Sequence, residues 1–431
     1  MMRSRLRAIL TLAAPTALVS ILQVAAQLFE TWLAARQGTA ALAGWAVVLP
    51  FALLMQMMSA GAMGGGVVSA IARALGAGRR EEASALVLHA ALIALAAAAI
   101  FALPLALAPR AVLGWVGGAE AAAAAAPYAA WLFGAGALPA WFANTLASVL
   151  RGAGRHALAA RVLVLAWAGY PPLAWALAEP AGMGLAGIGA AFAAVFWVAA
   201  AAMGLVVLRG GAGFRPVLRV APSRVMFRRI LSVGLVACVL AAIANMTTIM
   251  VTAQLAAQGP AVVAAYGISA RLEFIMIPLA FGIGSALTAL VGRAVGGGDW
   301  AEARRLAWTG GGLAFLLAGA VGLVVTAFPL PFARAFTADA EVAAIAARAL
   351  RVIGPAYGCF GLGMAMYFAC QGAGRMGWPV AAALSRFAVA VGGGALLAGP
   401  YGLEGQFLGV ALGITAYGLV TAASVRPAVW R

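Results

Sequence analysis

The sequence contains no lysine, only two histidines and only three cysteines, and these shortages exclude several classes of enzyme. Without lysine, no P-loop can hold the phosphates of ATP and no Schiff base can form with a pyridoxal or retinal cofactor. No HExxH, GxSxG or paired-cysteine motif is present. The three cysteines lie inside apolar segments, where a free thiol behaves as a small hydrophobic group. We therefore expect no enzyme activity, no metal and no cofactor.

Charged residues are also scarce. They make up 9% of the 431 residues, against 65% hydrophobic residues and a mean hydropathy of +1.03. A soluble protein of this length needs more polar surface, so the chain is expected to lie in a bilayer. About 20 apolar residues span the hydrocarbon layer. The sequence has twelve such segments, six in each half, at residues 8–33, 41–72, 84–108, 127–150, 157–178, 185–208, 230–257, 261–292, 306–328, 343–369, 377–398 and 405–425.

All 28 basic residues are arginine, and their distribution predicts the orientation of the chain. Loops on the N-terminal side of the membrane carry twenty arginines, and the opposite loops carry five. The positive-inside rule then places both termini in the cytoplasm, in a protein of the inner membrane. The net charge of +17 does not indicate nucleic acid as a partner, because the arginines are scattered over short segments without an aromatic platform. His89 and His156 each adjoin a predicted cytoplasmic loop, and we expect both to be solvated surface residues.

The N-terminal arginines before an apolar run are also the pattern of a signal peptide. The run is too long for a signal core, and Glu30 interrupts any cleavage site of small residues. We expect a retained first helix.

The chain is internally duplicated. RALGAGRREEA at residues 73–83 returns as RAVGGGDWAEA at 293–303, and RGAGR at 151–155 returns as QGAGR at 371–375, both displaced by 220 residues. A duplicated apolar chain is typical of a two-lobed transporter with its site between the repeats. The predicted lobes are residues 1–208 and 230–431, joined by an arginine-rich cytoplasmic linker at 209–229.

One polar stripe runs along the first predicted helix. It contains Thr16, Ser20, Gln23, Gln27 and Glu30, whose spacings of 4, 3, 4 and 3 residues place them on one helix face. Burying polar groups in lipid is costly, so the stripe is a candidate cavity wall that ends in a titratable carboxylate, with Glu30, Gln27 and Gln23 as the cation-coupling residues. Pro15 would bend the helix nearby. The alternatives are a polar helix seam, or an interfacial glutamate.

Other polar residues within the spans are candidates for substrate binding. In the second half they are Asn245, Arg271 and Glu273, and in the first half Asn144. Arg271 is expected to offset the charge of Glu273 in part, although residues two apart do not face each other on a helix. The alternative for Glu273 is a structural ion pair. Tyr357 and Met364 suit a greasy binding cavity, and their alternative is core packing.

The sequence resembles the multidrug and toxic compound extrusion (MATE) transporters over nearly its whole length. The similarity rests on LFET at 28–31, QGTAALAG at 37–44, the loops at 73–83 and 151–155, GMGLAGIGAA at 182–191 and their second-half counterparts. It implies a V-shaped pair of six-helix bundles related by a pseudo-twofold axis, and antiport of protons or sodium against cationic drugs. Members typically carry aspartate where this chain has Glu30. Many carry an acidic residue near Tyr170, and its absence here favours protons over sodium.

The sequence therefore predicts a monomeric, proton-coupled antiporter that exports lipophilic or cationic small molecules by alternating access. One alternative is a flippase for lipid-linked oligosaccharides, which needs a wide basic cavity for pyrophosphate. Another is a membrane-embedded transferase, which needs a convergent acid, base and nucleophile that the sequence does not show. Substrate identity and coupling stoichiometry do not follow from the sequence.

Overall fold

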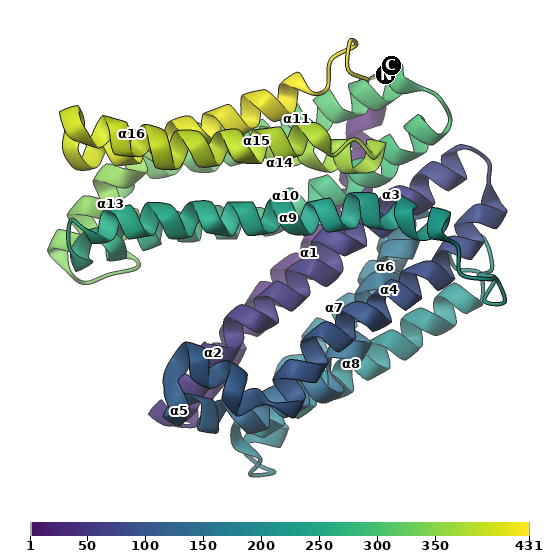
Figure 1. Ribbon diagram of the computed structural model, residues 1–431, viewed down its shortest axis with the longest axis horizontal. Coiled ribbons are helices and arrows are strands. Elements are labelled where there is room, and N and C mark those ends of the chain that lie inside the picture. Colours follow the sequence, from purple (N-terminus) through teal and green to yellow (C-terminus); the bar gives the residue numbers. More distant parts are fainter. Residues whose placement is uncertain (1, 431) are drawn as a thin grey trace. The chain divides into compact units, whose positions relative to one another are not determined.

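The computed structural model describes residues 2–430, apart from the side chains of residues 274, 275 and 279, and every regular element in this range is helical. In lipid, backbone polar groups must be satisfied within the segment that carries them, so an apolar chain forms helices. The first half contains α1 (Met2–Arg36), α2 (Thr39–Gln56), η1 (Met57–Ala62), α3 (Met63–Gly76), α4 (Arg80–Leu107), α5 (Pro109–Ala129), η2 (Ala130–Ala135), α6 (Ala137–Gly152), α7 (His156–Ala178) and α8 (Gly184–Leu208). The second half contains α9 (Arg224–Ala256), α10 (Pro260–Gly296), α11 (Trp300–Ala327), α12 (Pro329–Arg334), α13 (Ala340–Ile353), η3 (Gly354–Ala356), α14 (Tyr357–Ala373), α15 (Gly377–Phe387), η4 (Ala388–Gly393) and α16 (Gly394–Ala423) (Figure 1).

The helices reproduce the predicted membrane spans. Within residues 2–430, ten helical segments are long and apolar enough to cross a membrane, and Pro109–Ala135 with Ala137–Gly152 forms an eleventh that is bent by 44°. Gly377–Ala423 is 47 residues long, roughly twice what a bilayer needs. Gly402 breaks it with φ 57° and ψ −134°, and Gly409 then packs on the backbone of Gly394, so the chain folds back on itself. That segment holds two spans, which confirms the predicted all-α fold with twelve membrane spans.

The chain forms two compact units. One contains Ala14–Gly234, and the other contains the residues up to Ala13 together with those from Leu235 onward. The first turns of α1 therefore pack with the second half of the chain, and the first turns of α9 pack with the first half. Two ion pairs hold these turns: Arg5 of α1 binds Glu302 at 2.7 Å, and Arg229 of α9 binds Glu82. Glu82 and Glu302 are 220 residues apart, so they occupy equivalent positions in the two repeats. Each of them binds an arginine from the first turns of α9 or α1, respectively.

The duplication is also visible in how helices pack within each unit. Glycines allow α3 to approach α6 closely, and α10 to approach α14. A Cβ added to any of these glycines would lie within 3 Å of an atom of the neighbouring helix. The contacts are Gly64 with Ser148, Gly152 with Val68, Gly284 with Phe368 and Gly372 with Thr288. Each residue of the first two pairs lies 220 positions before its counterpart in the other two. Both repeats therefore use the same close helix crossing.

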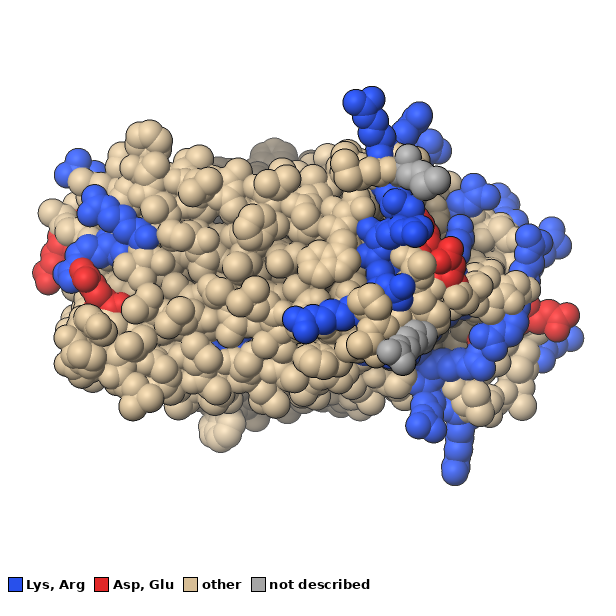
Figure 2. All heavy atoms as spheres, turned by 90° about the horizontal axis from the view of Figure 1, so that it is seen from above, with Lys and Arg blue, Asp and Glu red and all other residues tan. Residues whose placement is uncertain are grey.

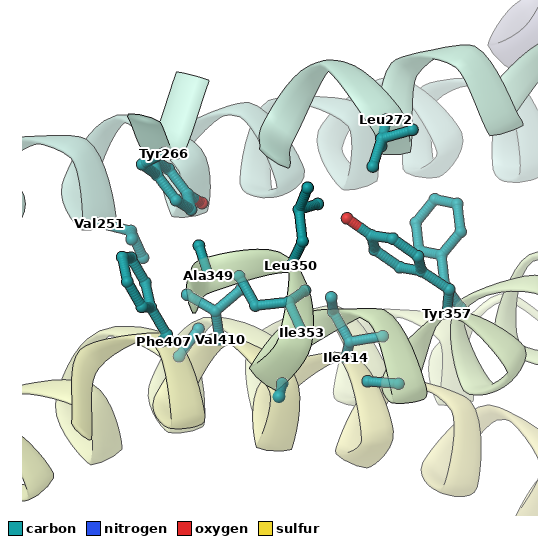
Figure 3. Packing of buried hydrophobic residues seen from close by; sticks show 14 of the residues in the cluster. Val251, Tyr266, Leu272, Ala349, Leu350, Ile353, Tyr357, Phe407, Val410 and Ile414 are labelled. Carbon is teal, nitrogen blue, oxygen red and sulfur yellow. The ribbon is translucent and has the colours of Figure 1, made fainter. Parts of the chain in front are cut away.

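The core of the second unit is built from aromatic and branched side chains (Figure 3). Tyr266 of α10, Leu350 of α13, Tyr357 of α14 and Phe407 of α16 all belong to one buried cluster. Tyr357 is completely buried, and its hydroxyl donates to the backbone oxygen of Ser269 at 3.3 Å. Tyr357 is therefore part of the hydrophobic packing of this unit.

Charged side chains gather toward the ends of the helices (Figure 2). On the face shown, most arginines lie toward one end, and a wide uncharged band separates them from a smaller group. At the end of α1, Arg36 donates to Glu179 at 2.6 Å, just beyond the end of α7. This hydrogen bond holds the pKa of the Glu179 carboxyl below its usual value. The pair is exposed, so it orients the helix ends more than it stabilises them.

Candidate functional site

The polar stripe of α1 faces protein, and the opposite face of the helix does not. Thr16 and Glu30 are buried, and Ser20, Gln23 and Gln27 are half-buried. Four large apolar residues on the other side of the helix are exposed: Leu18, Ile21, Val24 and Leu28. Pro15 lies inside α1 without ending it. The predicted amphipathic arrangement of this helix is therefore present, with its polar side turned inward.

Glu30 is the centre of the candidate site. Its carboxylate is 8% exposed and accepts two hydrogen bonds at Oε1, one from the indole of Trp45 at 3.0 Å and one from the hydroxyl of Tyr128. Tyr170 also interacts with the Glu30 carboxylate, although no hydrogen bond of ordinary geometry joins them. The two donors come from α2 and α5, and Tyr170 of α7 lies close by, so three helices surround one carboxylate. Glu30 is therefore enclosed by protein and is not an exposed surface glutamate.

Two glycines allow these helices to approach. A Cβ on Gly44 would lie 2.8 Å from the backbone of Ala125, so α2 and α5 touch beside Trp45. A Cβ on Gly189 would lie 2.8 Å from the backbone oxygen of Tyr128, so α8 packs directly against α5 at this tyrosine. Gly44 and Gly189 belong to the motifs at 37–44 and 182–191. These glycine-rich motifs therefore position the donors of Glu30.

An aromatic cluster lies beside Tyr170. Trp167 and Tyr170 of α7 contact Phe192 and Phe196 of α8, with ring centroids 5.3–6.4 Å apart and several edge-to-face arrangements. Such packing excludes water from this side of the carboxylate. The sequence did not indicate Trp45, Tyr128 or the aromatic cluster. The only indication of this region in the sequence was Tyr170, which lies where the family resemblance predicts an acidic residue.

The two histidines correct the sequence prediction, because both are buried. His89 donates from Nδ1 to the backbone oxygen of Ala85 at 2.8 Å and accepts at Nε2 from the backbone N–H of Ser223 at 2.9 Å. His156 is 1% exposed, and its Nδ1 lies 3.1 Å from the hydroxyl oxygen of Thr16. Both were expected to be solvated because they adjoin loops. The neighbouring helices α9 and α1 cover them instead.

Asn144 lies in a separate polar cluster of the first unit. Its Nδ2 donates to Gln56 Oε1 at 3.1 Å and to Ser59 Oγ at 2.9 Å. All three side chains are buried, and Ser59 belongs to the π-helical turn η1, which realigns the helix between α2 and α3. The structure does not join Asn144 to Glu30. Gln56, whose Nε2 has no hydrogen-bond partner among the described residues, was not singled out by the sequence.

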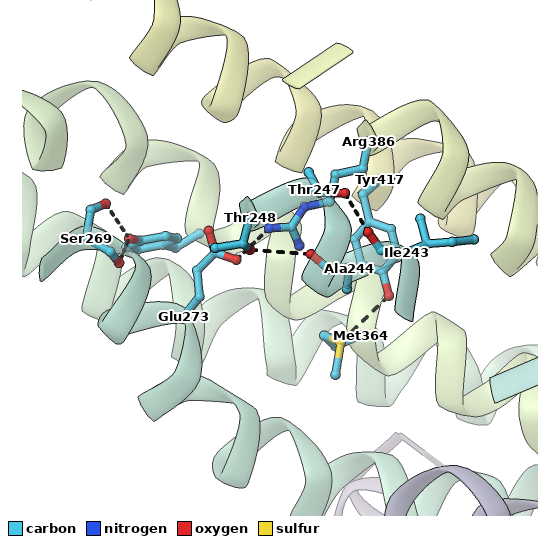
Figure 4. Close-up of polar contacts among 10 residues, drawn as sticks. Ile243, Ala244, Thr247, Thr248, Ser269, Glu273, Met364, Arg386 and Tyr417 are labelled. Carbon is cyan, nitrogen blue, oxygen red and sulfur yellow. Dashed lines mark hydrogen bonds and ion pairs between the residues drawn. The ribbon is translucent and has the colours of Figure 1, made fainter. Parts of the chain in front are cut away.

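The second unit has its own buried carboxylate. Arg386 of α15 donates from Nη2 to Glu273 Oε2 of α10 at 2.6 Å, and both side chains are mostly buried (Figure 4). The guanidinium also lies over the ring of Phe360, 5.7 Å from its centroid. The expectation that Arg271 offsets Glu273 is wrong, because Arg271 is exposed and Arg386 takes that role. Residues 271 and 273 leave the helix in different directions.

The remaining second-half candidates are divided between this cluster and the exposed surface of the unit. Met364 accepts a long hydrogen bond of 3.6 Å from Tyr417, close to Arg386 in Figure 4. Asn245 is exposed and donates to the backbone oxygen of Ala241 at 2.9 Å. Among the described contacts, the structure therefore brings Glu273 and Arg386 together and leaves Asn245 and Arg271 apart from them.

Two duplicated units of membrane-spanning helices, with Glu30 enclosed in one and Glu273 in the other, define a polytopic membrane transport protein. The family model MatE matches residues 15–176 and 235–395, one segment in each half. The chain belongs to the MatE family, and it is a multi-pass membrane transporter. Among curated proteins, none matches the chain.

Several solved structures have the same fold. The bent form of the Vibrio cholerae MATE transporter VcmN is 22% identical, with a TM-score of 0.92 over 99% of this chain and 98% of that one. A MOP superfamily transporter from Pyrococcus furiosus is 22% identical, with a TM-score of 0.89 over 98% and 95%. An outward-facing multidrug resistance MATE family transporter is 23% identical, with a TM-score of 0.88 over 98% and 95%.

Proposed function

We propose that this protein is a proton-coupled antiporter that exports lipophilic or cationic small molecules by alternating access. The observation that carries this proposal is Glu30, a buried carboxylate with two neutral hydrogen-bond donors and no cation beside it. A carboxyl group at such a depth is costly unless it is used, and intramembrane acids in transporters commonly carry protons. The description of one similar structure as a multidrug resistance transporter supports the substrate class.

The groups around Glu30 favour a proton over sodium. Sodium requires several oxygen ligands, but the indole N–H of Trp45 can only donate. The hydroxyl of Tyr128 is also oriented as a donor to Oε1. Neither of these two bonds uses Oε2, so this oxygen can take up a proton without displacing them. Where many relatives are expected to carry a second acidic residue, this chain has Tyr170.

The coupling cycle follows from the two charge states of Glu30. With the site open to the outside, Glu30 takes up a proton and becomes neutral, and the substrate is released. With the site open to the cytoplasm, Glu30 gives up the proton and the next substrate binds. For a neutral substrate, a proton that crosses about 100 mV gains about 2.3 kcal/mol, which supports a roughly fifty-fold substrate gradient. For a monovalent cation exchanged one for one, the two charge movements cancel, and the pH gradient is the driving force.

Glu273 would not take part in this proton step, because Arg386 already satisfies it at 2.6 Å. We propose that the Glu273–Arg386 pair recognises the charge of the substrate. A cationic substrate interacts with the carboxylate in competition with Arg386, and Phe360, Tyr417 and Met364 supply apolar contact nearby. The same pairing argues against the flippase alternative, since a paired arginine offers less to a pyrophosphate.

The proposed location is the inner membrane, with both termini in the cytoplasm, as the arginine distribution predicts. The test of the function is reconstitution in proteoliposomes with cationic dyes. Uphill dye transport should follow an imposed pH gradient and should not follow a sodium gradient at constant pH. Transport that requires sodium would overturn the choice of ion, and transport that requires neither gradient would overturn the coupling.

A further inference from the structure

We propose that His156 is the cytoplasmic end of a proton path that starts at Glu30. This inference rests on the proposed function and adds a residue to it. The imidazole and the carboxylate lie in the same unit, and the polar stripe of α1 runs from one to the other. The stripe therefore has a titratable group at each end: Glu30, which the sequence indicated, and His156, which it did not.

The geometry follows from three connections between α1 and α7. Thr16 contacts His156, Glu30 interacts with Tyr170, and Arg36 binds Glu179 beyond the end of α7. Fourteen residues separate Thr16 from Glu30, and fourteen also separate His156 from Tyr170. The two helices therefore follow each other in register over about four turns, or about 21 Å. His156 and Glu30 are held at opposite ends of this stretch.

Of the two helices α1 and α7, it is α1 that supplies the polar groups between the two ends. On α7 the buried residues between His156 and Tyr170 are all apolar: Ala159, Ala160, Leu163, Ala166 and Trp167. On α1 the same interval contains Ser20, Gln23 and Gln27, which are half-buried. Half-buried amides and hydroxyls can hold a file of water molecules, whereas an apolar face of α7 cannot. The polar face of α1 is thus the route by which a proton can pass.

Each transfer balances in atoms and charge. The carboxylic acid of Glu30 gives its proton to a water on the stripe and becomes a carboxylate. The proton moves along hydrogen-bonded waters to Thr16, whose hydroxyl accepts one proton and passes its own to Nδ1 of a neutral His156. Nε2 of His156 is buried in this structure, so the resulting imidazolium releases its second ring proton when the site opens to the cytoplasm, and ring tautomerisation returns it to the starting state. Histidine suits this position because its imidazole exchanges protons near neutral pH.

The charged neighbours of His156 in sequence are arginines. Arg151 is buried at the end of α6, and Arg155 is exposed directly before α7. Thr16, the contact from α1, is neutral. These three residues are two arginines and a neutral threonine, so none of them would hold an imidazolium in an ion pair.

The test compares His156→Gln with Glu30→Gln in proteoliposomes loaded with a pH dye. Glutamine keeps a hydrogen-bonding group near Thr16 but cannot carry a proton. We expect His156→Gln to slow substrate-driven proton release by about a hundredfold, the lower end of the range for loss of a positioned acid–base group. Dye binding and dye counterflow without a gradient should stay within about twofold of wild type. His89→Gln removes the other buried histidine, whose bonds go to Ala85 and Ser223, and should leave proton release unchanged.

Three results would overturn the proposal. Proton release at the wild-type rate in His156→Gln, with coupling lost in Glu30→Gln, would mean that the path avoids His156 while the proposed function stands. Equal losses in binding, counterflow and proton release, or the same loss in His89→Gln, would show a structural role. Coupled export that persists in Glu30→Gln would remove the proposed function itself.

Discussion

Arg386 lies 2.6 Å from Glu273, whereas the carboxylate of Glu30 has only neutral donors. The two buried acids are not related by the duplication, because 220 residues beyond Glu30 is Met250 and 220 before Glu273 is Leu53. The repeats share their helix packing but have different polar interiors. One unit is therefore suited to carry a proton and the other to recognise charge, and the predictions below separate these roles.

Glu30→Gln should reduce uphill dye export to the level of protein-free liposomes, because the amide keeps the volume and accepts the bond from Trp45 but cannot release a proton. Glu30→Asp is the matched control and should retain coupling, since only one methylene is lost. Efflux and a detergent melting curve are measured together. Wild-type export by Glu30→Gln with unchanged melting would show that the stripe is only a packing seam.

Tyr128→Phe should weaken coupling without abolishing it. The change removes one hydrogen bond to a charged group, worth about 1.5–3 kcal/mol, and leaves the ring in place. We expect at least about a tenfold fall in the rate of proton-driven export. Tyr401→Phe, at an exposed position, is the control and should have no effect. Equal rates for both variants would mean that Tyr128 does not act on Glu30.

Gly189→Ala should disturb the packing of α8 against Tyr128 and thereby the position of this donor to Glu30. Its Cβ would lie 2.8 Å from the backbone oxygen of Tyr128, so α5 or α8 must shift. Overpacking of this kind typically costs about 1–3 kcal/mol, which a lower melting temperature would show. Gly169→Ala on α7 meets no atom within 4 Å and should be neutral. If Gly189→Ala melts and exports like Gly169→Ala, the supposed support of Tyr128 by α8 is wrong.

The sequence predicted the elements of this structure better than the contacts of its site. Span lengths, the repeat and the inward face of α1 follow from hydropathy and spacing, which are local properties. Trp45, Tyr128 and Tyr170 meet Glu30 only through the packing of four helices, and no spacing in the sequence indicates it. The sequence did not indicate Arg386 as the partner of Glu273, which lies 113 residues away in the chain.

Cysteine labelling tests the orientation of both repeats. Residues Ala77 and Gly297 should react only from the cytoplasm, and the exposed Thr39 and Gln258 only from outside, because six spans return the chain to its starting side. Gly38 and Gly259 are unsuitable, since their φ values of 103° and 115° strain any side chain. A background without the three native cysteines is the control. Opposite accessibility of Ala77 and Gly297 would reveal an inverted duplication.

The Glu273–Arg386 pair predicts discrimination between substrates by charge. Glu273→Gln should weaken binding of a monovalent cation by about 1–2 kcal/mol, if one charge-assisted contact is lost, while a neutral lipophilic substrate is still exported. Because removal of one partner leaves a buried arginine uncompensated, stability should also fall, and it should recover when Arg386→Met is added. The double variant thus separates folding from recognition: it should melt near wild type and still discriminate poorly. Equal loss of charged and neutral substrates in the double variant would show that the pair only holds α10 and α15 together.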